Sequence, residues 1–109
     1  MTVPDTVRVG HRRYTIDLVD RLTERGESGV TFHESRRIEV ADNLAAEPER
    51  EVVLHETLHA VMEYVGVNYD YAAEDPPGEE QLVTRLAPAL LALLVDNPRL
   101  VGYLVEGSA

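Results

Sequence analysis

Residues 52–61 read VVLHETLHAV and contain the pattern His-Glu-x-x-His, formed by His55, Glu56 and His59. On a helix, residues four apart lie on the same face, one turn above the other. Two imidazoles at this spacing can bind one metal ion together, and Glu56 can act as the general base on a metal-bound water. This stretch therefore predicts both a helix and a metal centre on it.

The residues around the motif predict where its helix begins and ends. Pro48 and the acidic residues beside it suit a first helical turn, and Gly66 suits a helix end. We therefore expect a helix from about Glu47 to about Val65. Its apolar positions extend around most of the cylinder, which predicts a buried central helix with both histidines in a dry, rigid setting.

The chain before the motif has the period of strands. Apolar residues alternate with polar ones at residues 7–9, 14–18, 30–32 and 38–40, with turn residues between them. After the motif, residues 67–78 have the composition of a loop, and two helical segments follow, one to Val95 with Pro88 inside it and one from Pro98 to Val105. We expect one α+β domain over residues 1–109, mainly strands in 1–44 and mainly helices in 45–109, with a small antiparallel sheet.

Composition and charge exclude several classes of protein. The 109 residues include no Cys, so there is no disulfide scaffold, thiolate zinc finger or cysteine nucleophile. The 20 acidic residues outnumber the ten basic ones, which argues against nucleic acid as a partner. No secretory signal is visible, and the longest apolar run, residues 86–95, is too short to cross a bilayer. We expect a cytoplasmic protein without a membrane partner.

A catalytic zinc site needs a third protein ligand beside the two motif histidines. Without Cys, this ligand must be His11, His33 or an acidic residue. The best candidates are Glu79 and Glu80, at the start of the helix that follows the loop. Periodicity puts Glu79 at the centre of that helix's apolar stripe and Glu80 at its side, next to small residues that allow close approach. Thr84, one turn after Glu80, could hydrogen-bond a metal ligand.

A family resemblance chooses between these two acids. The motif helix, the segment EQLVTRLA at residues 80–87 and the pair at 90–91 resemble the ImmA/IrrE-like group of small zincin metallopeptidases, which includes compact forms carried by phages and mobile elements. The resemblance covers about residues 28–95. In it Glu80 falls on the third-ligand position, while Thr84 replaces the group's Asn or Asp and Val83 its usual Ala. It implies Zn²⁺ bound in the gluzincin arrangement by His55, His59 and Glu80, with Glu79 as the alternate.

The resemblance also implies a substrate-binding strand. In zincins an edge strand beside the site pairs with an extended peptide through main-chain hydrogen bonds. The candidate strand by position is the segment Arg36, Arg37, Ile38, Glu39 and Val40. In the loop between the two metal-bearing helices, Tyr69 and Tyr71 could donate a hydrogen bond to a developing oxyanion.

Two functions follow as hypotheses, and both carry the metal-binding fold. The first is a zinc-dependent metallopeptidase that hydrolyses a peptide or protein substrate through a metal-activated water. The alternative is a zincin-fold regulatory or protein-binding module without peptidase activity. The sequence leaves the substrate and the oligomeric state open.

Overall fold

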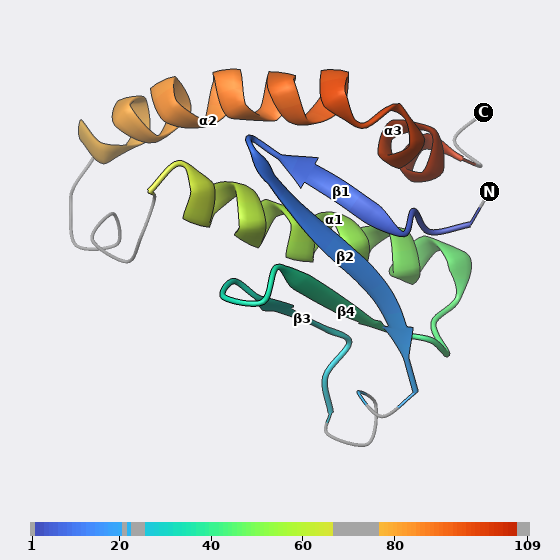
Figure 1. Ribbon diagram of the computed structural model, residues 1–109. Helices are drawn as coiled ribbons and strands as arrows, with labels where there is room; N and C mark the ends of the chain where they lie inside the picture. Colours follow the sequence, from blue (N-terminus) through green and yellow to red (C-terminus); the bar gives the residue numbers. More distant parts are fainter. Residues whose placement is uncertain (1, 21, 23–25, 67–76, 107–109) are drawn as a thin grey trace.

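The computed structural model shows an α+β fold in which four strands precede three helices (Figure 1). The structure describes residues 2–20, 22, 26–66 and 77–106, and the side chains of 77–80 are not included in that description. The strand-then-helix order matches the order expected from the sequence. The elements are β1 (Thr6–Val9), β2 (Arg12–Val19), β3 (Gly29–Phe32), β4 (Arg37–Ala41), α1 (Ala46–Tyr64), α2 (Pro77–Asp96) and α3 (Pro98–Val105).

The sheet is mixed, and the expectation of an antiparallel sheet was wrong. Its strand order is β1-β2-β4-β3, with β1–β2 and β3–β4 antiparallel hairpins and β2–β4 parallel. β3 does not pair with β2 but forms the edge of the sheet, and β4 lies between β2 and β3. The strand that follows the hairpin turn is therefore an interior strand.

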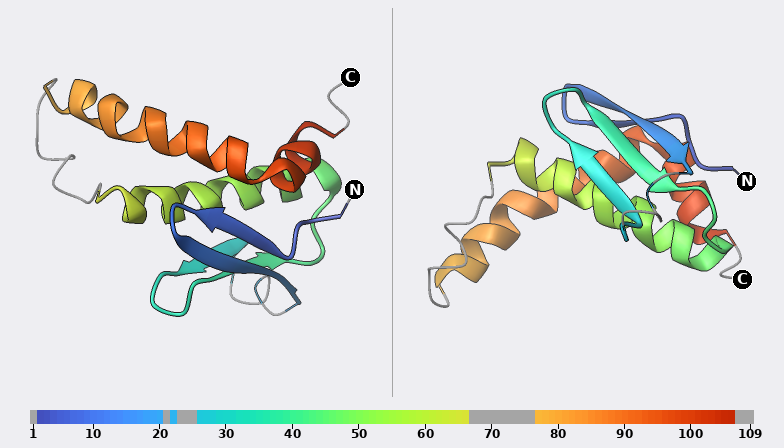
Figure 2. Two further views of the ribbon diagram at one scale, coloured as in Figure 1. Left: turned by 45° about the horizontal axis from the view of Figure 1, so that its top comes forward. Right: turned by 90° about the horizontal axis from the view of Figure 1, so that it is seen from below.

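One face of the sheet packs against the helices and the other faces outward. On β2, Tyr14 and Ile16 are buried, whereas Thr15 and Asp17, which alternate with them along the strand, are exposed. Such alternation is typical of a sheet that is covered on one side. Figure 2 shows α1 and α2 on the same side of the sheet. The core lies in this interface, where strand residues such as Ile38 and Val40 meet Val53, Ala60 and Val61 of α1.

The limits of the helices agree with their sequence signals. α1 ends just before Gly66, whose φ of 77° lies in the left-handed region that glycine adopts without strain. α2 contains Pro88, as expected, and α3 begins at Pro98. In the described residues no single helix is long and apolar enough to cross a bilayer. The pair Gln81–Asp96 and Pro98–Val105, bent by 92°, passes that test by length and composition alone.

The expectation that α1 is buried all round was wrong. Its fully buried side is narrow and consists of Val53, Glu56, Thr57, Ala60 and Val61. Leu54 and Leu58 are exposed, as are both motif histidines. A helix that lies on one face of a four-stranded sheet buries only the stripe that touches the strands, however apolar its other residues are.

The two edges of the sheet differ. At β1, the main-chain N–H of Arg8 donates to Asn97 Oδ1 at 2.7 Å, and Asn97 Nδ2 donates to the Arg8 carbonyl at 2.7 Å. This side-chain amide occupies the outward-facing groups of one edge residue in the way a further strand would. At β3, the other edge, no further strand is paired within the described part of the chain. The open edge is the one beside α1.

Candidate metal centre

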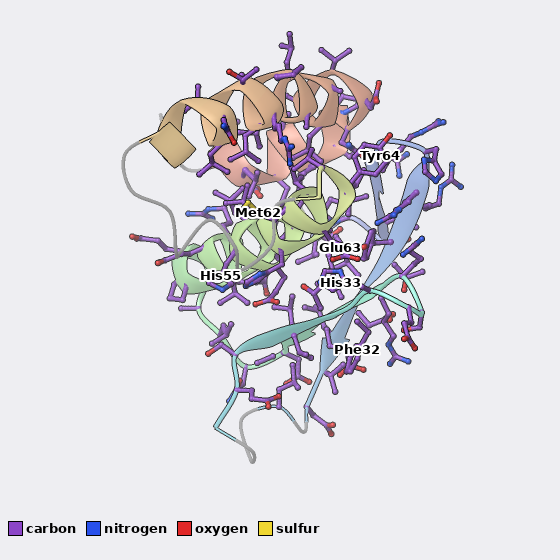
Figure 3. The ribbon with its side chains drawn as sticks, turned by 90° about the vertical axis from the view of Figure 1, so that its left-hand side faces the viewer. Phe32, His33, His55, Met62, Glu63 and Tyr64 are labelled. Carbon is purple, nitrogen blue, oxygen red and sulfur yellow. The ribbon has the colours of Figure 1, made fainter. Side chains whose placement is uncertain are left out.

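The two motif histidines converge, one helical turn apart, on the exposed side of α1. His59 Nε2 lies 3.2 Å from His55 Nε2, and the ring centroids are 4.8 Å apart. The His55 side chain is 65% exposed, so the dry setting expected from the sequence was wrong. Figure 3 shows His55 on α1, which lies between α2 and the sheet in that view. Exposure leaves both rings accessible to an ion from solvent.

The separation of the two nitrogens fits a shared zinc ion. Two imidazole nitrogens bound to one tetrahedral Zn²⁺, each at about 2.0–2.1 Å, lie about 3.3 Å apart. The 3.2 Å between the Nε2 atoms of His55 and His59 matches this value. The same distance also suits a hydrogen bond in which one neutral ring donates and the other accepts. The distance between the two Nε2 atoms is therefore compatible with a shared zinc ion and with a direct hydrogen bond between the rings.

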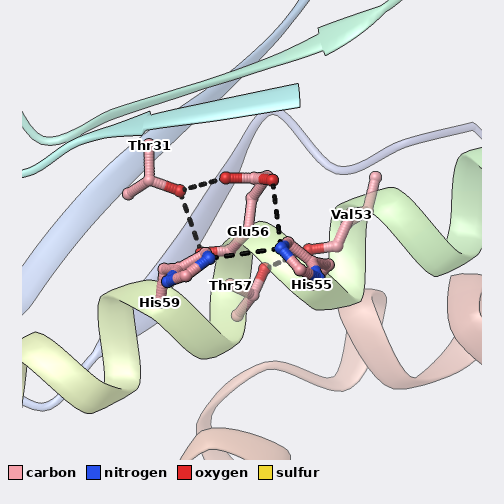
Figure 4. A network of polar contacts seen from close by, with 6 residues as sticks. All are labelled: Thr31, Val53, His55, Glu56, Thr57 and His59. Carbon is pink, nitrogen blue, oxygen red and sulfur yellow. Dashed lines mark hydrogen bonds and ion pairs between the residues drawn. The ribbon is translucent and has the colours of Figure 1, made fainter. Parts of the chain in front are cut away.

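Glu56 points from α1 toward β3 and is nearly buried (Figure 4). Its Oε1 accepts a hydrogen bond of 2.8 Å from the Thr31 hydroxyl, which also lies 3.1 Å from the Glu56 carbonyl oxygen. Its Oε2 lies 3.8 Å from His55 Nε2. One carboxylate oxygen is therefore held by the sheet, and the other faces the histidine pair.

Gly29 provides the space that Glu56 occupies. A Cβ at residue 29 would stand 2.6 Å from Val52 Cγ1, 3.0 Å from Glu56 Cγ and 3.2 Å from Glu56 Oε2. Real Cβ atoms do not approach side-chain atoms this closely without displacing them, because protein interiors are close-packed. Because residue 29 has no side chain, the Glu56 carboxylate can lie close to the edge strand β3.

The main chain of β3 presents hydrogen-bonding groups beside this carboxylate that no other described residue uses. The N–H of Ala41 donates to the Ser28 carbonyl at 2.8 Å. In an antiparallel ladder the pairing groups alternate, so the groups of Ser28 and Val30 face β4 while those of Gly29 and Thr31 face outward. An extended peptide could pair with these outward groups.

A pocket of about 440 Å³ opens at the same place. It lies between the start of β3 and the first turns of α1. Its described lining includes both Glu56 and His55, so the pocket adjoins the histidine pair and the carboxylate. The lining residues are Ser28, Gly29, Leu44, Pro48, Glu51, Val52, His55 and Glu56.

The side chain of the third ligand predicted from the sequence lies outside the described part of the structure. The backbone of Glu79 and Glu80 is helical, at the start of α2, but their side chains lie outside the described residues. Thr84 lies on α2 with its side chain exposed. Tyr69 and Tyr71 also lie outside the described residues. Among the residues that are described, no group of three possible ligands surrounds one point.

The two remaining histidines make other contacts. His11 lies in the β1–β2 turn with its ring 5.5 Å from that of Tyr64, in an edge-to-face arrangement. His33 Nδ1 lies 3.3 Å from the hydroxyl of the buried Tyr14. In the described part of the chain, His11 and His33 contact these tyrosines and not His55 or His59.

The proposed substrate strand was placed wrongly by the sequence. Arg36 lies in the turn after β3, with a φ of 55°, and Arg37–Val40 belong to β4. β4 pairs with β2 on one side and with β3 on the other, so its main-chain groups are already used. A peptide cannot add to it. The neighbouring strand β3 has the free edge.

Thr31 and Gly29 were not identified from the sequence. Val30 and Phe32 are the apolar residues of the alternation that predicts this strand. In the structure Phe32 is 43% exposed, and Thr31 between them points at α1. The sequence held one signal for these two residues: Gly29 and Thr31 are two apart, and residues at this spacing lie on the same face of a strand.

Comparisons of this chain with protein-family models, with curated proteins and with solved structures found no match.

Proposed function

We propose that this chain is a zinc-dependent metallopeptidase that hydrolyses peptide bonds in a peptide or protein substrate. The observation that carries the proposal is the convergence of three groups: the Nε2 atoms of His55 and His59 at 3.2 Å, and Glu56 Oε2 at 3.8 Å from His55 Nε2. Two ring nitrogens with a carboxylate beside them are the groups that a His-Glu-x-x-His motif contributes to a peptide-hydrolysing zinc site.

His55 and His59 would hold the metal, with Glu80 as the third ligand and Glu79 as its alternate. When bound, Zn²⁺ supplies a Lewis acid that polarises the scissile carbonyl and lowers the pKa of water. Glu56 Oε2 would take the proton from the attacking water and pass it to the leaving amine. The carboxylate is suited to this task because its other oxygen is already held by Thr31.

The substrate would lie extended along β3. The outward main-chain groups of Gly29 and Thr31 offer it hydrogen bonds, and the pocket beside Glu56 offers room for a side chain. Main-chain pairing recognises any extended peptide, so sequence preference would come from the pocket. We propose the cytoplasm as the location of this activity.

The test is the variant Glu56→Gln, which keeps the size of the side chain and its Thr31 contact but removes the base. It should bind zinc as the wild type does and lose about 10²- to 10⁴-fold in hydrolysis of a fluorescence-quenched peptide library. Glu63→Gln, an exposed change on the same helix, is the matched control and should retain activity. Undiminished hydrolysis by Glu56→Gln contradicts the mechanism.

A second candidate function is a zincin-fold regulatory or protein-binding module without peptidase activity. The observation that favours it is the outer side of α2, where Val83, Leu91, Leu94 and Val95 are large, apolar and exposed. Exposed apolar residues grouped on one element commonly mark an interaction site. A wild type that binds zinc, cleaves no peptide of the library and binds one protein through this side of α2 would support this function over the first.

A further inference from the structure

We propose that Thr31 is a positioning residue for the general base: its hydroxyl fixes the Glu56 carboxylate so that Oε2 is the oxygen that exchanges protons with the substrate. This inference rests on the proposed peptidase function. It concerns a residue of the edge strand, outside the His-Glu-x-x-His motif.

The two carboxylate oxygens of Glu56 are distinguished by their surroundings. Oε1 receives the Thr31 hydroxyl at 2.8 Å, and Oε2 faces His55 Nε2 at 3.8 Å. A glutamate side chain has several rotamers of similar energy, and a charge-assisted hydrogen bond to one oxygen selects among them. With Oε1 held against β3, the group that remains to face the reacting atoms is Oε2.

The surroundings leave the carboxylate little freedom to turn away. Gly29 packs against Glu56 so closely that a Cβ at residue 29 would lie 3.0 Å from Glu56 Cγ. Val52 closes the same space from one turn earlier on α1, and the side chain of Glu56 is only 9% exposed. The Thr31 hydroxyl is the one hydrogen-bond donor from another element that the described residues provide to this carboxylate.

Thr31 also contacts both the general base Glu56 and the edge along which the substrate would lie. Its side chain points at Glu56, while its main-chain N–H and C=O face the open edge of β3. A peptide that pairs with this edge would immobilise the residue that holds the base. Alignment of the substrate and orientation of Glu56 would then depend on the same strand residue, and a small misplacement of either lowers the rate steeply.

Two substitutions separate the hydroxyl of Thr31 from its shape. Thr31→Val keeps the branched side chain and removes the hydroxyl, whereas Thr31→Ser keeps the hydroxyl and removes a methyl group. With the fluorescence-quenched peptide best cleaved by the wild type, Thr31→Val should lower kcat by about ten- to a hundredfold and change KM by less than about twofold. Thr31→Ser should retain most of kcat.

The matched control and an activity-independent measurement complete the test. Thr15→Val makes the same chemical change at an exposed position of β2 and should leave kcat unchanged. In zinc-free protein, urea unfolding of Thr31→Val, Glu56→Ala and the double variant should show coupling between the two residues, because each single change removes their hydrogen bond. Zinc titration should show unchanged affinity in Thr31→Val.

The outcomes separate this inference from the proposed function. If the wild type is active and Thr31→Val matches it, or if Thr31→Ser is as impaired as Thr31→Val, the positioning role is overturned while the peptidase proposal stands. Additive unfolding energies in the double variant overturn it as well. A wild type that cleaves no peptide of the library overturns the peptidase proposal, and this role with it.

Discussion

The side-chain amide of Asn97 forms two hydrogen bonds of 2.7 Å with the main chain of Arg8, across a separation of 89 residues. Asn97 lies between α2 and α3, and its Nδ2 also donates to the Leu93 carbonyl at 2.8 Å. One residue thus contacts the end of α2 and closes the β1 edge at Arg8. Unpaired edges invite further strands. Within the described residues, the chain closes one edge at this position and leaves open the edge beside Glu56.

The first prediction concerns this closure. Asn97→Ala removes three hydrogen bonds and should lower the free energy of unfolding by about 1–3 kcal/mol, measured by urea denaturation. Asn97→Asp keeps an acceptor for Arg8 but removes both donated bonds, so its loss should be nearly as large. Asn43→Ala, at an exposed turn position, is the control and should change stability by less than about 0.5 kcal/mol. A change at residue 97 no larger than that at 43 would contradict the closure.

The second prediction concerns the space at Gly29. Gly29→Ala places a methyl group 2.6 Å from Val52 Cγ1 and 3.2 Å from Glu56 Oε2, so the side chains of Val52 and Glu56 must shift. We expect a stability loss of about 1–3 kcal/mol and a fall in peptide hydrolysis larger than the unfolded fraction explains. Glu27→Ala, at an exposed position before β3, should alter neither. Equal activity in Gly29→Ala and wild type would show that Glu56 does not depend on this space.

The third prediction concerns Tyr103, which joins α3 to α1. Its hydroxyl donates a hydrogen bond to Glu49 Oε1 at 2.7 Å. The pKa of Tyr103 is raised well above its usual value, mainly by burial of the phenol and also by this hydrogen bond to a carboxylate. Because the neutral phenol is favoured in the folded state, this contribution to stability is complete below about pH 10 and is lost as the pH rises further. By pH 11 the loss should reach about 1.4 kcal/mol.

Urea unfolding at pH 8 and pH 11 measures this effect, with Tyr103→Phe as the comparison. The variant lacks the titrating group, so its stability should fall less between the two pH values than that of the wild type. All other ionisable side chains are the same in both proteins, so their contributions cancel in the difference. An equal fall in both proteins would mean that Tyr103 ionises alike in the folded and unfolded chain.

The limits of the helices could be predicted because single residues mark them. Pro48 and Gly66 bracket α1, and Pro98 begins α3. The position of β4 could not be predicted in this way. Its short alternating pattern suits an interior strand and an edge strand equally, and its place between β2 and β3 depends on pairing with segments distant in the sequence. Local residues determine local structure, whereas strand order depends on packing between distant segments.

The chemistry of the site was predictable to a similar degree. The spacing of His55 and His59 dictates that their rings meet, and their nitrogens do. Their exposure was not predictable, because Leu54 and Leu58 beside them suggested burial and are themselves exposed. The partner of Glu56 comes from β3, and only the register of that strand against α1 brings Thr31 opposite it.

The last prediction concerns the metal itself. Wild-type protein purified without a metal-affinity tag should bind one zinc ion per chain, measured by elemental analysis, and His55→Ala and His59→Ala should each reduce this strongly. Glu80→Ala should reduce it as well, whereas Glu79→Ala should not; the reverse result would assign the third ligand to Glu79. Because zinc binds the folded chain, saturation at about 100 times the Kd should add about 2.7 kcal/mol to the stability, and a chelator should remove this gain. If the wild type binds no zinc and its stability does not change with chelator, the metallopeptidase is excluded. The 3.2 Å contact between the two rings is then a hydrogen bond between the imidazoles.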